Sequence, residues 1–426
     1  MGTPAVQMDA WHSLQAVHLD LFYPRLTTLG LCIHQPGVTV NQRGATDVTP
    51  QPATQPSQRL LSLDVLRGLT VAVMILVNNA GDGAVSYAQL RHSAWNGCTL
   101  TDVVFPLFLF IVGVSVALAF QRRLDRGAAR TTILLQVLQR ALLIFVLGLV
   151  LNALPFFQLS GLRYYGVLQR IALCYLLASI VYLLGGFKAS ATVAVALLIG
   201  YWLLLTHVRV PHFGMPGVDV PLLDPVANLP AWLDRTLVPA AHLYHNTVYD
   251  PEGLLSTLPA LGTTLLGVLA ARVLQSNWVS TKRTLTLILC GLFGILAGLL
   301  WSHAFPFNKR LWTSSYVLFT AGIASTLLGT LHGLIDGPLR WRRGLTPFVI
   351  FGTNALFAYI LSEVIAIILH AITFDGNLTL QQVTYRLLPT WLGPPPFVSL
   401  LYSVLFVAVC LLPTAYLYRH KIFLKI

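Results

Sequence analysis

A histidine, a carboxylate and several amides gather in one short stretch of this sequence. Between residues 78 and 106 lie Asn78, His92, Asn96 and Asp102, in a chain of which only 10% is charged. Polar groups are costly to desolvate in so apolar a chain, and they usually mark a functional site. Imidazole titrates near neutral pH, so His92 is the candidate for acid–base chemistry. The simpler alternative is a histidine satisfied by a loop carbonyl.

Asp102 is the candidate partner of this histidine. It follows His92 by ten residues, near the start of a predicted helix. Its carboxylate could orient the imidazole, or it could cap the helix. The residues alone leave both roles open.

The elements that must position these residues are membrane helices. The chain has 426 residues, 56% of them hydrophobic, and a mean hydropathy of +0.72. Several apolar runs reach the roughly 20 residues that span about 30 Å of hydrocarbon. We therefore predict an all-α, polytopic integral membrane protein. The net charge of +12 lies largely in short loops, so it indicates orientation in a lipid bilayer and no nucleic-acid partner.

A membrane domain is expected over residues 58–426, after a poorly ordered extension at 1–57. Its ten predicted spans are 62–80, 100–120, 133–152, 165–184, 189–207, 256–274, 283–303, 313–332, 346–370 and 397–418. The extension lacks a basic start followed by an unbroken apolar run, so no cleaved signal peptide is expected. The five cysteines have no metal or redox spacing, and no metal site is expected.

Loop charges orient the predicted helices. Basic residues follow the second, sixth, eighth and tenth spans, and the positive-inside rule places these loops in the cytoplasm. Both termini are then expected to be cytoplasmic, with His92 at the outer mouth of the first two helices. Lys309 and Arg310 break the rule, because they lie on the outer side. Lipid anchoring is one explanation, and an anion or carboxylate contact within the protein is the other.

Eight motifs lie in order along the membrane domain. They are 62–68 (SLDVLRG), 74–78 (MILVN), 92–97 (HSAWNG), 102–113 (DVVFPLFLFIVG), 166–172 (GVLQRIA), 250–257 (DPEGLLST), 308–315 (NKRLWTSS) and 352–356 (GTNAL). In this combination the sequence resembles the transmembrane acyltransferase family of heparan-α-glucosaminide N-acetyltransferase, as a bacterial relative. The lysosomal enzyme of that family carries a large lumenal domain before this core. Residues 1–57 provide none, which argues against a polymeric heparan substrate and favours a bacterial inner membrane.

The resemblance implies transfer of an acetyl group from cytosolic acetyl-CoA to a glucosamine-type amino sugar on the far side of the membrane. The family's catalytic histidine matches His92, and an asparagine of its active site matches Asn78. His92 could take the proton of the acceptor, or attack the thioester to form an acetyl-imidazole, and both routes stay open. The Asn78 amide could stabilise charge on the thioester oxygen, or it could be a helix C-cap.

Arginines inside the apolar spans are the predicted donor-binding residues, because their guanidinium groups match the phosphates of CoA. Arg67 and Arg140 fall in the inner halves of their spans. Gln169 and Arg170 fall in an outer half, where Arg170 fits the thioester end or a buried ion pair. Asp64, one turn before Arg67, could instead make a structural pair with it.

The predicted acceptor contacts are Asn96, Asp250, Glu252, Lys309, Arg310 and Asn354. The carboxylates of Asp250 and Glu252 could meet the ammonium or hydroxyl groups of a sugar, or they could pair with the two cations. On the ninth span, Asn354 and Glu363 are nine residues apart and face opposite sides of a helix. Of these two we favour Asn354.

A transporter of N-acetylglucosamine-type sugars is the alternative function. Transporters also place polar groups inside the membrane, near broken helices. The sequence lacks Gly/Pro-interrupted spans in matching halves, and its best polar cluster lies at one membrane face. A scaffold without small-molecule activity is disfavoured, since buried arginines and amides would then cost stability without a gain. The oligomeric state stays open, a homodimer included.

Overall fold

The structure is a computed structural model that describes residues 60–374 and 378–424, and these are almost entirely helical. The predicted extension at 1–57 lies outside the described residues. Eight helices are long and apolar enough to cross a membrane: α3 (Leu61–Asn78), α4 (Leu100–Asp125), α5 (Arg130–Ala153), α6 (Val167–His207), α8 (Thr257–Gln275), α9 (Ser280–Ser302), α10 (Ser314–Leu331, with a π turn to Asp336) and α14 (Pro395–Arg419). The predicted class, an all-α polytopic membrane protein, is confirmed.

The ten predicted spans differ from these eight helices in two places. The fourth and fifth predicted spans both lie in α6, which breaks at Gly186, where φ is 59° and ψ is −143°. The ninth predicted span is a pair of helices, α11 (Thr346–Thr353) and α12 (Ala355–Ala371), bent by 87°. Hydropathy locates apolar segments, but it carries no information on the angle at which two segments join.

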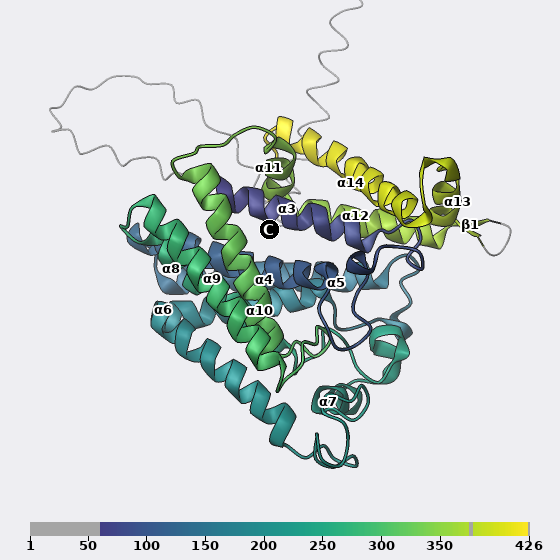
Figure 1. The fold of residues 1–426 in the computed structure, drawn as a ribbon, viewed down its shortest axis with the longest axis horizontal. Helices are drawn as coiled ribbons and strands as arrows, with labels where there is room; N and C mark the ends of the chain where they lie inside the picture. The colour runs from purple at the N-terminus through teal and green to yellow at the C-terminus, as the bar shows by residue number, and fades with distance from the viewer. Residues whose placement is uncertain (1–59, 375–377, 425–426) are drawn as a thin grey trace, which may run out of the picture.

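The helix α3 carries Asn78 at its C-terminal end. Its N-terminal half crosses α11 at close range. A Cβ atom on Gly68 would lie 1.7 Å from the carbonyl oxygen of Phe348, and one on Gly352 would lie 1.9 Å from that of Asp64. Only glycine at both positions permits this approach. In Figure 1, α3, α11, α12 and α14 form one group beside α4, α8, α9 and α10.

Short elements and long loops gather at one end of the helical bundle. These are the loops 79–99 and 303–313, the helices α7 (Leu229–Leu237) and α13 (Leu380–Arg386), and the paired two-residue strands β1 (Thr373–Phe374) and β2 (Leu378–Thr379) (Figure 1). Below the loops, Trp312 and Tyr316 are fully buried, and Trp312 meets the Phe105 ring edge-on at 5.2 Å. The functional candidates therefore sit on helix ends and loops above a packed aromatic layer.

Candidate functional site

The His92 imidazole is held by the carboxylate at the start of α4. His92 Nδ1 lies 2.8 Å from Asp102 Oδ1, and Asp102 Oδ2 accepts from the backbone N–H groups of Ser93 at 3.1 Å and Thr99 at 3.0 Å. Asp102 is the third residue of α4 and completes a capping box with Thr99. The two roles left open for Asp102 are therefore both present in the structure, one on each carboxylate oxygen.

This pairing selects the tautomer of the neutral ring. A carboxylate only accepts, so Nδ1 carries the hydrogen and Nε2 is the nitrogen with the lone pair. The His92 side chain is 48% exposed, whereas that of Asp102 is 1% exposed. His92 thus presents a basic nitrogen to solvent or substrate from an anchored ring.

Lys309 lies against the same imidazole. Its Nζ is 3.1 Å from Nδ1 and 3.4 Å from Nε2 of His92, and 3.9 Å from Asp102 Oδ1. Burial lowers the pKa of Lys309, while the charges of Asp102 and Glu252 act in the opposite direction. Of the two explanations left open for Lys309, a contact within the protein is the one the structure shows.

A tight turn holds Lys309 in place. The Asn308 amide donates to Asn96 Oδ1 at 3.1 Å and accepts from the N–H of Leu311 at 2.9 Å. The N–H of Gly97 donates to the carbonyl of Phe307 at 2.8 Å. Asn96, a predicted substrate contact, is bonded here to the loop that carries Lys309.

Cys98 stands close to these groups but does not share their chemistry. Burial, followed by the charge of Asp102, raises the pKa of the Cys98 thiol to about 12. The nucleophilic form of cysteine is the thiolate, which this environment suppresses at neutral pH. His92 is therefore the better candidate for an activated group.

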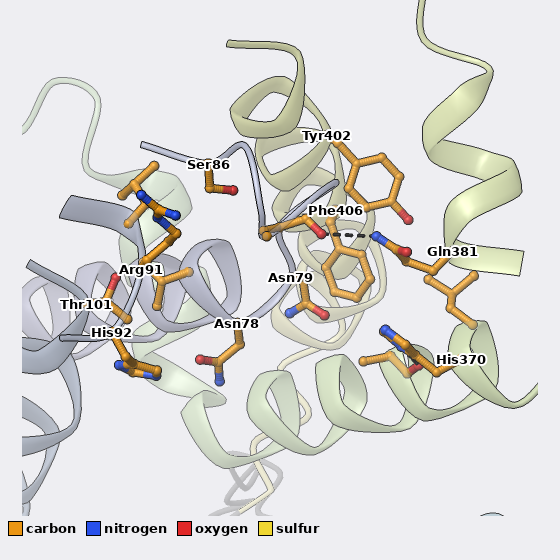
Figure 2. A pocket seen from close by; sticks show the side chains of 16 residues that line it. Asn78, Asn79, Ser86, Arg91, His92, Thr101, His370, Gln381, Tyr402 and Phe406 are labelled. Atoms are coloured by element: carbon orange, nitrogen blue, oxygen red, sulfur yellow. Dashed lines mark hydrogen bonds between the residues drawn. The ribbon is translucent and has the colours of Figure 1, made fainter. Parts of the chain in front are cut away.

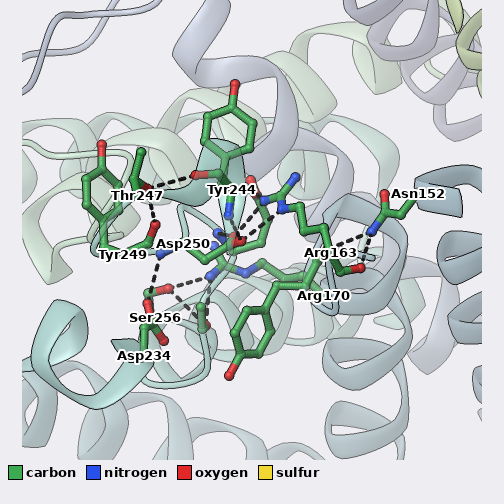
Figure 3. A network of polar contacts seen from close by, with 12 residues as sticks. Asn152, Arg163, Arg170, Asp234, Tyr244, Thr247, Tyr249, Asp250 and Ser256 are labelled. Carbon is green, nitrogen blue, oxygen red and sulfur yellow. Dashed lines mark hydrogen bonds and ion pairs between the residues drawn. The ribbon is translucent and has the colours of Figure 1, made fainter. Parts of the chain in front are cut away.

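A second polar network joins the loop between α5 and α6 to the segment that precedes α8 (Figure 3). Arg163 binds Asp250 through Nε at 2.8 Å and Nη2 at 2.5 Å, and its Nη2 also binds Glu252 at 2.6 Å. Burial favours the neutral form of Glu252, but the charges of Arg163, Arg170 and Lys309 outweigh it and lower its pKa. The ion pairs of both carboxylates are with Arg163, which corrects the expected alternative of pairing with Lys309 and Arg310.

Arg170 and Gln169 lie beneath this network at the start of α6. Arg170 is 1% exposed and its Nη2 donates to the carbonyl of Gly253 at 3.1 Å and to the Ser256 hydroxyl. Its guanidinium also lies 5.1 Å from the centre of the Trp312 ring. Arg170 therefore holds the segment before α8 against the core.

Two cavities meet at His92. The larger, which we call the charged cavity, has a volume of about 500 Å³, and its charged lining residues are Asp102, Arg163, Glu252, Lys309, Arg310 and Glu363. The smaller, which we call the amide cavity, has a volume of about 330 Å³ and is lined by Asn79, His370, Gln381, Tyr402 and Phe406 among others (Figure 2). Asn78 and His92 line both cavities. The two residues therefore form part of the wall between them.

Asn78 is oriented by a carboxylate on α12. Glu363 is hydrogen-bonded to the side chains of Asn78 and Tyr359. The alternative role for Asn78 was that of a helix C-cap. In the structure the C-cap of α3 is Asn79, whose Nδ2 donates to the carbonyl of Ile75 at 2.8 Å. The Asn78 amide is thus left facing the cavities.

Comparison with known proteins bears on this site directly. Residues 59–298, more than half of the chain and including His92 and Asp102, match the sequence model of the family described as heparan-alpha-glucosaminide N-acetyltransferase, catalytic. The chain belongs to this family. It is 28% identical over 373 residues to the heparan-alpha-glucosaminide N-acetyltransferase of Mus musculus, covering 75% of this chain and 55% of the relative. The human protein of that name is 28% identical over 360 residues, covering 72% and 53%. The chain spans about half the length of the curated relatives it matches.

Within this member of the heparan-alpha-glucosaminide N-acetyltransferase family, the predicted donor-binding arginines lie apart from the two cavities. Arg67 Nη1 binds Asp64 at 3.0 Å and the Gly352 carbonyl at 3.2 Å, and its Nη2 binds Ser115 at 2.9 Å. The pair with Asp64 is the structural alternative expected for it. Arg140 is an exposed residue of α5.

Asn354 and Glu363 face different surroundings, as predicted. The sequence favoured Asn354 as the site residue, but Glu363 is the one that lines a cavity. Asn354 lies at the bend between α11 and α12, where it binds the carbonyl of Ile422 at 3.2 Å and the N–H of Leu424 at 3.1 Å. Glu363 lines the charged cavity with His92. The helical spacing separated the two residues, but it gave no sign of which side faced the site.

Arg163 was missed by sequence reasoning, although a signal for it existed. It lies in the predicted outer loop between the third and fourth spans, so it breaks the positive-inside rule as Lys309 and Arg310 do. All three of these outer cations line the charged cavity. An outer cation alone does not identify the site, however, because three further arginines of the predicted outer loops line neither cavity, namely Arg209, Arg235 and Arg386.

Proposed function

We propose that this chain is an integral-membrane acetyltransferase that moves an acetyl group from acetyl-CoA to the amino group of a glucosamine-type sugar. The observation that supports it best is the anchored His92 ring, whose Nδ1 lies 2.8 Å from Asp102, in the wall between two cavities. The names of the family and of the two relatives supply the class of reaction and acceptor.

In this proposal Nε2 of His92 acts as the base. It takes a proton from the acceptor amine while the amine nitrogen attacks the thioester carbonyl carbon. The C–S bond breaks, and the departing CoA sulfur receives the proton. Asp102 stabilises the imidazolium formed between these steps, as a buried carboxylate does for a catalytic histidine.

The negative charge that develops on the thioester oxygen requires fixed donors. Asn78 is held by Glu363, and the Lys309 ammonium lies 3.4 Å from His92 Nε2, so both donors border the place where the carbonyl would react. Transfer through an acetyl group carried on Nε2 would use the same nitrogen and the same donors. Mass spectrometry of the His92 peptide after incubation with acetyl-CoA alone separates the two routes.

The direction of transfer belongs to the same proposal. Acetyl-CoA would enter from the cytoplasm and the sugar from the other side of a bacterial inner membrane, with both termini cytoplasmic. Its support is the charge of the loops. The basic clusters after α4, α8, the π turn that ends α10, and α14 fall on one side if the helices alternate, with α6 counted as two spans that meet at Gly186 and α11 and α12 as one. Labelling of single introduced cysteines in intact cells and in inverted vesicles tests this orientation.

The proposed activity has a direct test. Purified protein is incubated with acetyl-CoA and glucosamine, and N-acetylglucosamine is measured by mass spectrometry. We expect product from the wild type and from the control His303→Ala, in which an exposed histidine outside both cavities is removed. His92→Ala should form none above background. Uptake of unmodified sugar into proteoliposomes without CoA, and no acetylated product, would overturn the proposal in favour of a transporter.

A further inference from the structure

The amide cavity differs in its chemistry from the charged cavity on the other side of His92. Among the residues that line it, Arg91 is the one with a fixed charge, and its Nη1 donates to the carbonyl of Ala84 at 3.4 Å. The remaining polar lining consists of amides, hydroxyl groups and imidazoles (Figure 2). Such a lining suits a ligand with many hydrogen-bonding groups and little charge.

Two side-chain amides in this cavity are oriented by the backbone. Asn79 Nδ2 donates to the Ile75 carbonyl at 2.8 Å, and Gln381 Nε2 donates to the carbonyls of Ala80 at 3.0 Å and Gly81 at 2.7 Å. Because the nitrogens are engaged, the carbonyl oxygens are fixed on the other side of each amide. Over residues 60–374 and 378–424, neither oxygen has a hydrogen-bond partner.

His370 contributes a third acceptor. Its Nδ1 lies 2.8 Å from the carbonyl of Ala366, one turn earlier in α12, so in the neutral ring Nδ1 carries the hydrogen and Nε2 has the lone pair. The cavity therefore collects three hydrogen-bond acceptors, Asn79 Oδ1, Gln381 Oε1 and His370 Nε2. Hydroxyl and amino groups are the donors that match them.

The remaining wall is aromatic, and the space is small. Tyr402 and Phe406 of α14 line the cavity, and an aromatic ring can pack against the C–H face of a pyranose. The volume of about 330 Å³ is at the lower end of the range for small-molecule sites, which suits a single sugar ring. A CoA molecule or an oligosaccharide would exceed it.

We propose that the amide cavity is the acceptor subsite and binds one pyranose ring of an amino sugar. The thioester end of the donor then occupies the charged cavity, and His92 and Asn78 lie between the two reactants because they line both spaces. This inference rests on the acetyltransferase function proposed above. It moves the acceptor from Asp250, Glu252 and Arg310, where the sequence placed it, to the opposite side of the histidine.

Gly83 offers a substitution that tests the subsite. It lines the amide cavity at an exposed turn, and a Cβ atom added to it would meet nothing within 4 Å. Gly83→Phe therefore adds a bulky group at the cavity without a clash in the protein. Gly161→Phe is the matched control, because Gly161 is also exposed, also has open space at its Cβ position, and lines neither cavity.

The readout is the separation of the two Michaelis constants. We expect Gly83→Phe to raise the KM for glucosamine at least about tenfold, while the KM for acetyl-CoA and the acceptor-independent hydrolysis of acetyl-CoA match those of Gly161→Phe and the wild type. His370→Ala, which removes an exposed side chain, should raise the glucosamine KM in the same selective way.

The outcomes separate the two proposals. A wild-type protein that acetylates no amino sugar would overturn the acetyltransferase function itself. A wild type that does so, with an unchanged glucosamine KM in both Gly83→Phe and His370→Ala, would overturn the acceptor subsite alone. A rise in the acetyl-CoA KM equal to that for glucosamine would assign the amide cavity to the donor and would likewise overturn it.

Discussion

Arg67 and His92 each bind a carboxylate through a side-chain nitrogen, Arg67 with Asp64 and His92 with Asp102, and the two pairs are used differently. Arg67 shares its donors among Asp64, Ser115 and the carbonyl of Gly352, at the crossing of α3 and α11. His92 engages one nitrogen with Asp102 and turns the other toward two cavities. The first arrangement stabilises helix packing, and the second keeps one atom available for chemistry. The difference between the two pairs is that one atom of the His92 ring still faces a cavity.

The largest effect is expected for a substitution of His92, which should lower the rate of acetyl transfer and leave the stability of the fold unchanged. His92→Ala should lower kcat for acetyl transfer by about 10³-fold, since general acid–base catalysis contributes about 10² to 10⁴. The half-exposed ring makes few packing contacts, so the thermal unfolding midpoint should stay near that of the wild type. Transfer assays and unfolding curves on the same preparation measure both. If the variant kept its turnover, His92 would have no role in the mechanism, and its pair with Asp102 would be structural, like that of Arg67 with Asp64.

Arg67→Ala should show the reverse pattern. Removing one partner of a buried pair typically costs about 3 kcal/mol, because the remaining carboxylate loses a charged group that it binds at 3.0 Å. We expect a lower unfolding midpoint and, in the protein that remains folded, a glucosamine KM like that of the wild type. A selective rise in the acetyl-CoA KM with an unchanged midpoint would instead give Arg67 the donor-binding role predicted from the sequence.

Asp102→Asn sharpens the comparison within the His92 site. An amide can still accept from the N–H groups of Ser93 and Thr99, so the start of α4 should form. The amide can also donate to Nδ1, which favours the wrong tautomer of His92, and we expect kcat to fall by about 10²-fold. A pH–rate profile checks the cause. Loss of stability without loss of rate would reduce Asp102 to a helix cap.

Asp234 in α7 extends the contrast to a carboxylate that forms no salt bridge within the described part of the chain. Burial, followed by the charge of Asp250, raises the pKa of Asp234 from 3.8 to about 6. The folded carboxyl then holds its proton more tightly than the unfolded one. This contribution to stability is fully present below pH 3.8 and is lost as the pH rises through about 6, by roughly 3 kcal/mol.

Unfolding midpoints measured from pH 4 to pH 7 check this prediction. The part of the change that is due to Asp234 should disappear in Asp234→Asn, whose amide does not titrate. An identical pH dependence in the variant would assign the titration to another group.

The smallest effect is expected at Arg140. It is an exposed residue of α5 and lines neither cavity. Arg140→Ala should therefore change the acetyl-CoA KM by no more than about twofold, as for most exposed substitutions. A large and selective rise in that KM would restore the donor-binding role predicted for it from the sequence.

The sequence predicted the fold class and the apolar segments because runs of this length have no other solution in a bilayer. The break of α6 at Gly186 falls between the two spans predicted at 165–184 and 189–207. The 87° bend between α11 and α12 was not predicted, since hydropathy does not report the angle between two segments. The pairing of His92 with Asp102 was among the expectations from the sequence because ten residues bring a loop back to the start of the next helix. Glu363 and Gln381 were out of reach, because they meet Asn78 and Ala80 only through tertiary packing over some three hundred residues.

The amide bridge between Asn96 and Asn308 has a mechanical consequence. Together with the bond from Gly97 to Phe307, it stitches the segment bearing the imidazole to the segment bearing the ammonium, so that both travel as a single rigid body. The distance between these two groups therefore depends on the two loops, whereas α12 and α13, which carry His370 and Gln381 of the amide cavity, take no part in these bonds.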